Sequence, residues 1–116
     1  GQVTIWNGEM RYQGKIGRDL TVDQGYDAAR MCGLNLIAQV RAACNGDLDR
    51  VKQVVKLGAF VNCVEDFTEH PNVVNGASDL MAEVFDDAGR CTRTNAGVPS
   101  LPLGFAVEID GVFEIE

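Results

Sequence analysis

The sequence predicts an α+β fold in which two helices cover one face of a single sheet. Apolar residues recur at helical steps of three and four in two segments and at alternate positions elsewhere, in the order β, α, β, α, β, β. With 116 residues and 46% apolar content, the chain can bury one modest core. We therefore expect one domain over residues 1–116.

The opening segment is predicted to form strands. Val3–Trp6 is rich in β-branched and aromatic residues, and Asn7-Gly8 is a strong signal for a two-residue hairpin turn. We expect Met10–Ile16 to form a second strand or an ordered loop.

A long helix is predicted to follow. Thr21 and Gln24 have the spacing of a capping box, and the apolar stripe that begins there lasts about six turns before Asn45-Gly46 ends it. Gly25 and Gly33 each lower helix propensity by about 1 kcal/mol relative to alanine. Their presence suggests that the helix packs closely against the sheet.

The second half is predicted to form a strand, a helix and two further strands. Val51–Val64 alternates as a long strand, and Val73–Ala88 carries a helical stripe that Gly89 ends. Strand-type sequence resumes at Arg90, breaks at two prolines, and finishes in the alternating run Phe105–Ile115. On the long strand, the face expected to be buried carries Val51, Val55, Leu57, Ala59, Val61 and Cys63.

The other face of the sheet is predicted to be mixed rather than fully polar. Two helices of one small chain cannot cover both faces, and association with other subunits is the ordinary remedy. We therefore expect self-association through the sheet, with polar pockets at the seams. This face is predicted to carry Val54, Phe60, Val64, Ala106 and Val112 among Lys52, Lys56, Glu108 and Asp110.

Charge and hydropathy argue against two classes of partner. The net charge of -7 opposes the counterion release that drives nucleic-acid binding. No stretch approaches the roughly 20 apolar residues that span a bilayer. We expect neither nucleic acid nor membrane as a partner, and a cytoplasmic location.

The thiols and the single imidazole suggest no metal or nucleophilic site. Cys32, Cys44, Cys63 and Cys91 form no CxxC pair, so we interpret them as reduced thiols in or near the core. His70 lies in a polar connector, where we expect a solvated loop residue, and no G-x-S-x-G motif supports a triad.

Arg93 is the strongest candidate for a binding residue. An arginine in an apolar β-type stretch must find an anion or reach solvent, because a buried unpaired guanidinium is costly. Its partner is either a ligand or one of two carboxylates of the last strand, Glu108 and Asp110, which we expect on a non-core face. Asn75 is a second candidate, and it also has a purely structural explanation. A polar side chain in a first helical turn can satisfy free backbone N–H groups.

Four segments together resemble the RidA family, also called the YjgF/YER057c/UK114 family. They are Gly1-Gln2, Gly14–Thr21, Val74–Leu80 and the run Arg93–Ile109, which is the most specific of them. The resemblance covers nearly the whole chain. Relative to the family pattern, the chain lacks the serine before Gly1 and an upstream segment, so we expect an N-terminal strand segment to be missing.

The resemblance implies a chorismate-mutase-like fold, assembled as a homotrimer with clefts between subunits. It also implies hydrolysis of reactive enamines and imines to 2-keto acids and ammonia, with no metal and no organic cofactor. By position, Arg93 matches the arginine that holds the substrate carboxylate, and Glu108 the glutamate associated with the attacking water. Asn75 and Gly1 match cleft contacts, and Asn95 stands where the deaminases often have cysteine.

Two functions of different classes follow from these residues. The first is a cofactor-independent enamine/imine deaminase that uses Arg93 and Glu108. The second is a non-catalytic trimeric module that binds a small carboxylate or a protein in the same cleft, which Asn95 would suit. Ribonuclease activity, which has been attached to some relatives, is opposed by the charge of -7 and by the single histidine.

Overall fold

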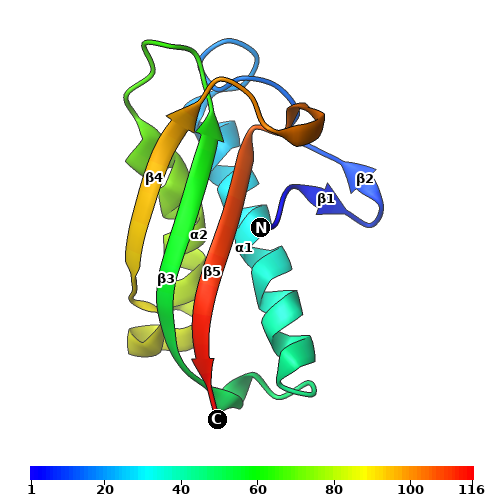
Figure 1. Ribbon diagram of the computed structural model, residues 1–116, viewed down its shortest axis with the longest axis vertical. Coiled ribbons are helices and arrows are strands. Elements are labelled where there is room, and N and C mark those ends of the chain that lie inside the picture. The colour runs from blue at the N-terminus through cyan, green and yellow to red at the C-terminus, as the bar shows by residue number, and fades with distance from the viewer.

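The computed structural model describes residues 1–116 and has a three-stranded mixed sheet at its centre (Figure 1). Strand β3 (Val51–Asn62) is the middle strand. Strand β4 (Thr92–Val98) pairs with it in parallel, and β5 (Val107–Ile115) pairs with it antiparallel. Both β4 and β5 are therefore edge strands.

Two helices lie side by side on one face of this sheet, behind it in Figure 1. They are α1 (Val22–Ala43) and α2 (His70–Phe85), and neither is long and apolar enough to cross a membrane. The predicted α+β arrangement, with two helices packed on a mixed sheet, is confirmed.

The limits of α1 follow from local sequence signals, as predicted. The Thr21 side chain accepts a hydrogen bond from the Gln24 backbone, and the Gln24 side chain accepts one from the Thr21 backbone. Asn45 and Gly46 end the helix with positive φ angles of 54° and 89°.

The close packing expected at the α1 glycines involves α2 rather than the sheet. A Cβ atom on Gly33 would lie 2.9 Å from the Leu80 side chain, and one on Gly25 would lie 2.9 Å from Val73. The prediction of a close approach was correct, but the partner was wrong. The reason is that the helices contact each other along their length, so small residues are needed between them.

Helix α2 begins earlier than predicted. It starts at His70 rather than Val73, and Pro71 occupies the first turn, where proline needs no hydrogen-bond partner for its nitrogen. It ends at Phe85 and continues as a short 3-10 turn over Asp86–Gly89. Other 3-10 turns span Leu48–Arg50 and Pro102–Gly104.

The predicted N-terminal hairpin is present but short. Strand β1 (Ile5–Trp6) pairs antiparallel with β2 (Glu9–Met10), and Asn7 and Gly8 turn between them with φ angles of 51° and 79°. In Figure 1 this hairpin projects beyond the β5 side of the sheet.

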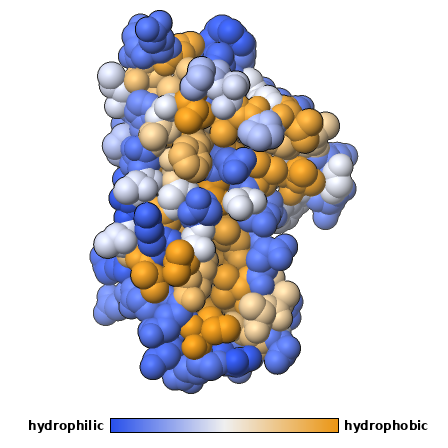
Figure 2. All heavy atoms as spheres, in the orientation of Figure 1, coloured by the Kyte–Doolittle hydropathy of each residue, from blue (hydrophilic) through white to orange (hydrophobic).

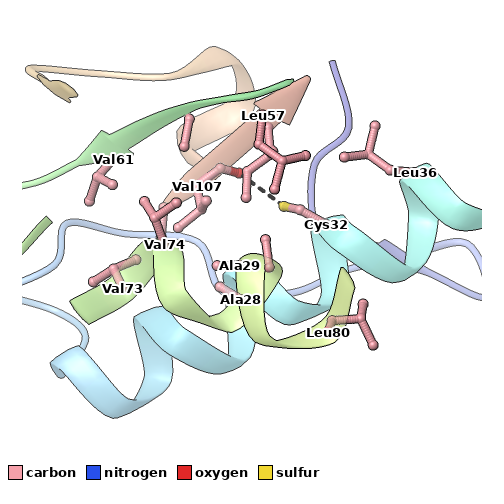
Figure 3. Close-up of a cluster of buried hydrophobic side chains, with 14 of the residues drawn as sticks. Ala28, Ala29, Cys32, Leu36, Leu57, Val61, Val73, Val74, Leu80 and Val107 are labelled. Carbon is pink, nitrogen blue, oxygen red and sulfur yellow. Dashed lines mark hydrogen bonds between the residues drawn. The ribbon is translucent and has the colours of Figure 1, made fainter. Parts of the chain in front are cut away.

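The core lies between the sheet and the helices (Figure 3). It contains 19 buried residues in one cluster. The Cys32 thiol donates a hydrogen bond to the Val107 carbonyl oxygen at 3.6 Å, which is the dashed line in Figure 3. The residues labelled there are Ala28, Ala29, Cys32, Leu36, Leu57, Val61, Val73, Val74, Leu80 and Val107.

A β-bulge changes the predicted faces of β3. Val54 pairs with Phe113 and Lys56 with Val112, so Val55 is an extra residue in the ladder. Val54 is fully buried while Val55 is 44% exposed, the reverse of what strict alternation predicted for both residues. Because side chains alternate between the two faces of a strand, one extra residue moves every residue on one side of the bulge, along the chain, to the opposite face from that predicted.

The open face of the sheet is a mixture of apolar and polar side chains, which Figure 2 shows from the front. Phe60 and Val112 are exposed there beside Lys56 and Asp110, as predicted. Ala106, which was predicted for this face, is instead fully buried. The apolar part of the open face is therefore smaller than the sequence suggested.

Candidate functional site

Arg93 lies on the helix side of β4. It pairs in register with Leu57, whose side chain is buried in the core, and paired residues of neighbouring strands point to the same face. Its guanidinium Nη1 donates a hydrogen bond of 2.8 Å to the Ser78 hydroxyl oxygen of α2. Arg93 is half-buried, so α2 holds it at the open edge of the sheet.

Of the two partners considered for Arg93, the alternative of a carboxylate within the chain, Glu108 or Asp110, is wrong. Both carboxylates belong to β5, where Glu108 pairs with Phe60 and Asp110 with Gly58. These pairs occupy the face opposite to Arg93, and β3 separates β5 from β4. The four salt bridges of the chain involve Arg11, Arg18, Arg30 and Arg90, so the Arg93 guanidinium has no carboxylate partner.

The two predicted asparagines lie along the same seam between β4 and α2. The strand and the helix run in opposite directions, because Arg93 contacts Ser78 whereas Gly97 approaches His70. On β4, Asn95 lies between Arg93 and Gly97. On α2, Asn75 lies between His70 and Ser78, and both asparagines are half-buried. The seam therefore carries one cation and two amides.

Gly1 and Glu108 meet at the other edge of the sheet. Gln2 pairs with Ile109 through two backbone hydrogen bonds of 2.7 and 3.0 Å, which places the start of the chain beside β5. A Cβ atom on Gly1 would lie only 2.8 Å from the Glu108 carboxylate oxygen. The predicted site residues thus form two separate groups at opposite edges of the sheet.

A third group of polar side chains surrounds a cavity of about 720 Å³ at the carboxyl ends of β3 and β4. His70 was predicted to be a solvated loop residue, but it is half-buried, and its Nε2 lies 3.5 Å from the Cys63 sulfur. The Lys15 ammonium group lies on the wall of this cavity and donates a 2.8 Å hydrogen bond to the Asn62 side-chain oxygen.

The four cysteines are free thiols, as predicted. Burial raises the pKa of Cys32 from 9.0 to about 12. It also raises the pKa of Cys63 and of Cys91, against the opposing charges of Lys15 and Arg93 respectively. No group of three or more His, Cys, Asp or Glu side chains is arranged to hold a metal ion.

Ser78 and the Cys63–His70 pair were missed at the level of sequence. Ser78 follows Asn75 by three residues on α2, so a helical projection would have placed the two on one face. Pro71 is a signal for a helix that starts beside it, and would have moved His70 out of the loop. The contact between Cys63 and His70 depends on tertiary structure and has no sequence signal.

Known proteins resemble this chain over most of its length. A family model described as "YjgF/chorismate mutase-like, putative endoribonuclease" matches residues 1–111. A curated relative, Protein TCP17 of Trypanosoma cruzi, is 52% identical over 103 residues, which are 88% of this chain. The matched region spans only 64% of that relative's length.

Two solved structures share the fold closely. The protein Atu1372 of Agrobacterium tumefaciens, whose function is described as unknown, matches with a TM-score of 0.98 and 43% identity, over 100% of this chain and 74% of its own. A putative endoribonuclease of Shewanella oneidensis MR-1 matches with a TM-score of 0.90 and 41% identity, over 94% of this chain and 72% of its own.

Proposed function

The chain belongs to the YjgF family, also called RidA, and on that premise we propose that it hydrolyses reactive enamines and imines of amino acids to 2-keto acids and ammonia. The reaction takes place in clefts between the subunits of a homotrimer. One observation carries the proposal: Arg93 presents a guanidinium at an open sheet edge, oriented by Ser78 and without a carboxylate partner. A cation held in this way is suited to an anionic ligand.

Arg93 binds the substrate carboxylate. One of its N–H groups is used by Ser78, and the planar guanidinium retains further donors that can grip a carboxylate with two parallel hydrogen bonds. This grip fixes the imine carbon next to the carboxylate. Asn75 and Asn95 lie along the same seam and supply amide groups to the rest of the ligand.

Glu108 handles the proton of the attacking water. An enamine first becomes an imine by moving a proton to carbon, and the protonated imine carbon is electrophilic. A water oxygen then bonds to this carbon while Glu108 accepts a water proton. Glu108 passes this proton to the nitrogen, the C–N bond breaks to release ammonia, and loss of the hydroxyl proton leaves the keto acid. Gly1 lies beside Glu108, so its backbone can contact the same ligand.

The separation of the two groups is the reason for proposing a cleft between subunits. Arg93 is on β4 and Glu108 on β5, at opposite edges and on opposite faces of one sheet. A cleft that contains both residues needs one of them from a neighbouring copy. A head-to-tail contact between unlike surfaces closes into a ring when the rotation permits, and a trimer is such a ring.

The test supplies an imine in situ. An amino-acid oxidase generates the imine, and release of keto acid is followed in the presence of wild-type protein, Arg93→Ala or Arg90→Ala. Arg90 is the matched control, because it is an exposed arginine three residues away that pairs with Asp87. We expect the wild type and Arg90→Ala to accelerate release, and Arg93→Ala to fall to the uncatalysed rate.

The same experiment distinguishes the binding module. If the wild type is no faster than Arg93→Ala, the enzyme proposal is lost. Titration calorimetry with a small 2-keto acid then decides the alternative: binding that Arg93→Ala abolishes would leave a carboxylate-binding module in the same cleft.

Mixed trimers test the shared cleft directly. Arg93→Ala and Glu108→Gln subunits are each expected to be inactive alone. If each cleft takes Arg93 from one subunit and Glu108 from the next, random equal mixing restores roughly one quarter of the clefts, because each mixed ring contains one intact pair. A site within one subunit would recover nothing on mixing.

A ribonuclease function, which the family description names, has less support in this chain. The net charge of -7 opposes attraction of a polyanion. The single histidine contacts the Cys63 thiol, and the chain has no second histidine to complete an acid–base pair for RNA cleavage.

A further inference from the structure

The cavity at the carboxyl ends of β3 and β4 adjoins the far end of the seam between β4 and α2, and Arg93 does not line it. Gly97 lines this cavity, and it lies four residues along β4 from Arg93, a distance of roughly 13 Å in a strand. Apolar surface comes from Phe67, Val64 and Val98, and polar groups come from a thiol, an imidazole and an ammonium group. None of these polar groups has a role in the proposed deaminase reaction.

Cys63 and His70 form a pair that depends on a glycine. The Cys63 sulfur and the His70 Nε2 lie 3.5 Å apart, within hydrogen-bonding distance for sulfur, and Phe67 packs edge-on against the imidazole. A Cβ atom on Gly97 would lie 2.5 Å from His70 Nε2 and 2.9 Å from the Cys63 sulfur. Any larger residue at 97 would therefore push the thiol and the imidazole apart.

Lys15 gives the cavity a cation with a free donor. Its ammonium group donates to the Asn62 side-chain oxygen and to the Pro99 carbonyl oxygen. An ammonium group has three N–H donors, so one remains for a ligand. Glu65 also lines the cavity, but its side chain is exposed, so solvent and salt screen its negative charge.

We propose that this cavity is a thiol site for small electrophiles that carry a carboxylate. Lys15 binds the carboxylate, His70 Nε2 accepts the thiol proton, and the Cys63 sulfur bonds to the electrophilic carbon. With an alkyl halide, the S–C bond forms as the carbon–halogen bond breaks, halide leaves, and the proton stays on the imidazole. Burial favours the neutral thiol, so the reaction depends on the adjacent base rather than on a preformed thiolate.

Iodoacetate and iodoacetamide test this proposal, because they perform the same alkylation and differ mainly in charge. The rate at Cys63 is measured for each reagent by mass spectrometry of the peptide that contains it, which separates it from the half-buried Cys91. We expect iodoacetate to react faster than iodoacetamide at Cys63 in the folded protein, and slower than iodoacetamide at the same residue in the urea-unfolded chain.

Three variants assign the roles. Lys15→Gln is expected to lower the iodoacetate rate about tenfold and to leave the iodoacetamide rate nearly unchanged, whereas Lys56→Gln on the open sheet face changes neither. His70→Gln is expected to lower both rates, by about a hundredfold for a lost general base. Gly97→Ala should reproduce the His70→Gln result, because it separates the pair without removing either group.

The outcomes are decisive even if a variant is partly unfolded. Unfolding exposes Cys63 and raises both rates, whereas the proposal requires each variant to lower at least one rate and to raise neither. If Cys63 of the folded wild type reacts with iodoacetate no faster than with iodoacetamide, the proposed preference for a carboxylate is overturned. Unchanged rates in His70→Gln would overturn the thiol–imidazole mechanism.

Discussion

Gly76 is a position where the backbone of α1 leaves no room for a side chain, and replacing it with alanine tests the helix packing directly. A Cβ atom at this position would lie 2.0 Å from the Tyr26 carbonyl oxygen and 3.0 Å from the Arg30 nitrogen. Both atoms belong to the backbone of α1, so no side-chain rotation can relieve the contact. Gly76→Ala therefore requires the two helices to separate.

The expected loss of stability combines two opposing effects. Overpacking a close contact costs about 1 to 3 kcal/mol, and a backbone obstacle favours the upper end. Alanine in place of a helical glycine returns about 1 kcal/mol. We expect Gly76→Ala to lower the free energy of unfolding by about 2 kcal/mol, which for a chain of this length lowers Tm by about 8 °C.

Gly33→Ala is the matched control within the same helix pair. Its Cβ atom would meet the end of the Leu80 side chain at 2.9 Å, and that side chain can move. The gain in helix propensity then nearly cancels the contact, and we expect a change within about 0.5 kcal/mol. Urea unfolding followed by circular dichroism measures both variants. A Gly76→Ala protein as stable as wild type, or less destabilised than Gly33→Ala, would refute the packing argument.

Three further predictions concern stability. Thr21→Ala removes the cap that accepts from the Gln24 backbone, and we expect a loss of about 1 kcal/mol by urea unfolding, with Thr21→Ser retaining most of the stability. Asn62→Ala removes the buried amide that donates to the Phe105 carbonyl and accepts from Lys15, and calorimetry should show a loss of about 2 kcal/mol. For Cys32, the unfolded thiol loses its proton near its ordinary pKa of 9.0 and the folded thiol near about 12, so high pH favours unfolding. Stability should fall as pH rises through this interval, and Cys32→Ala should make the fall less steep; an unchanged slope would argue that Cys32 does not cause it.

The elements that the sequence predicted well are those with local causes. The capping box at Thr21, the turn at Asn7-Gly8 and the stop at Asn45-Gly46 each depend on the conformations of a few neighbouring residues. The alternation of the last strand also matches the burial of Phe105, Val107 and Ile109, although Ile115 at its end is 38% exposed. Local patterns of this kind predict the structure well because they do not depend on which elements pack together.

The errors have non-local causes. The exchange of Val54 and Val55 comes from a bulge, and a bulge is defined by the partner strand rather than by the residues that contain it. The spacing of apolar residues in α1 shows that one face of the helix is buried. It does not show whether a helix or a sheet packs against the glycines on that face. His70 is different, since Pro71 carried a usable signal that the helical stripe starting at Val73 obscured.

The face on which Arg93 lies could not have been predicted from its strand. Thr92, Arg93, Thr94 and Asn95 are all polar, so alternation does not distinguish the two sides of β4. The register with Leu57 makes the distinction, and register is a property of the assembled sheet. The resemblance implied that Arg93 and Glu108 serve one site but contained no information about which subunit supplies each.

Because Arg93 and Glu108 lie at opposite edges of the sheet, a single chain cannot bring them to one ligand. In one chain, the Arg93 guanidinium at one edge and the Glu108 carboxylate at the other are half-buried and do not contact each other. In the proposed cleft between copies, desolvation would strengthen the interaction of both groups with a charged ligand, because the effective dielectric constant falls. Activity should therefore depend on protein concentration in the range where the oligomer dissociates, and the chemistry and the assembly should be lost together.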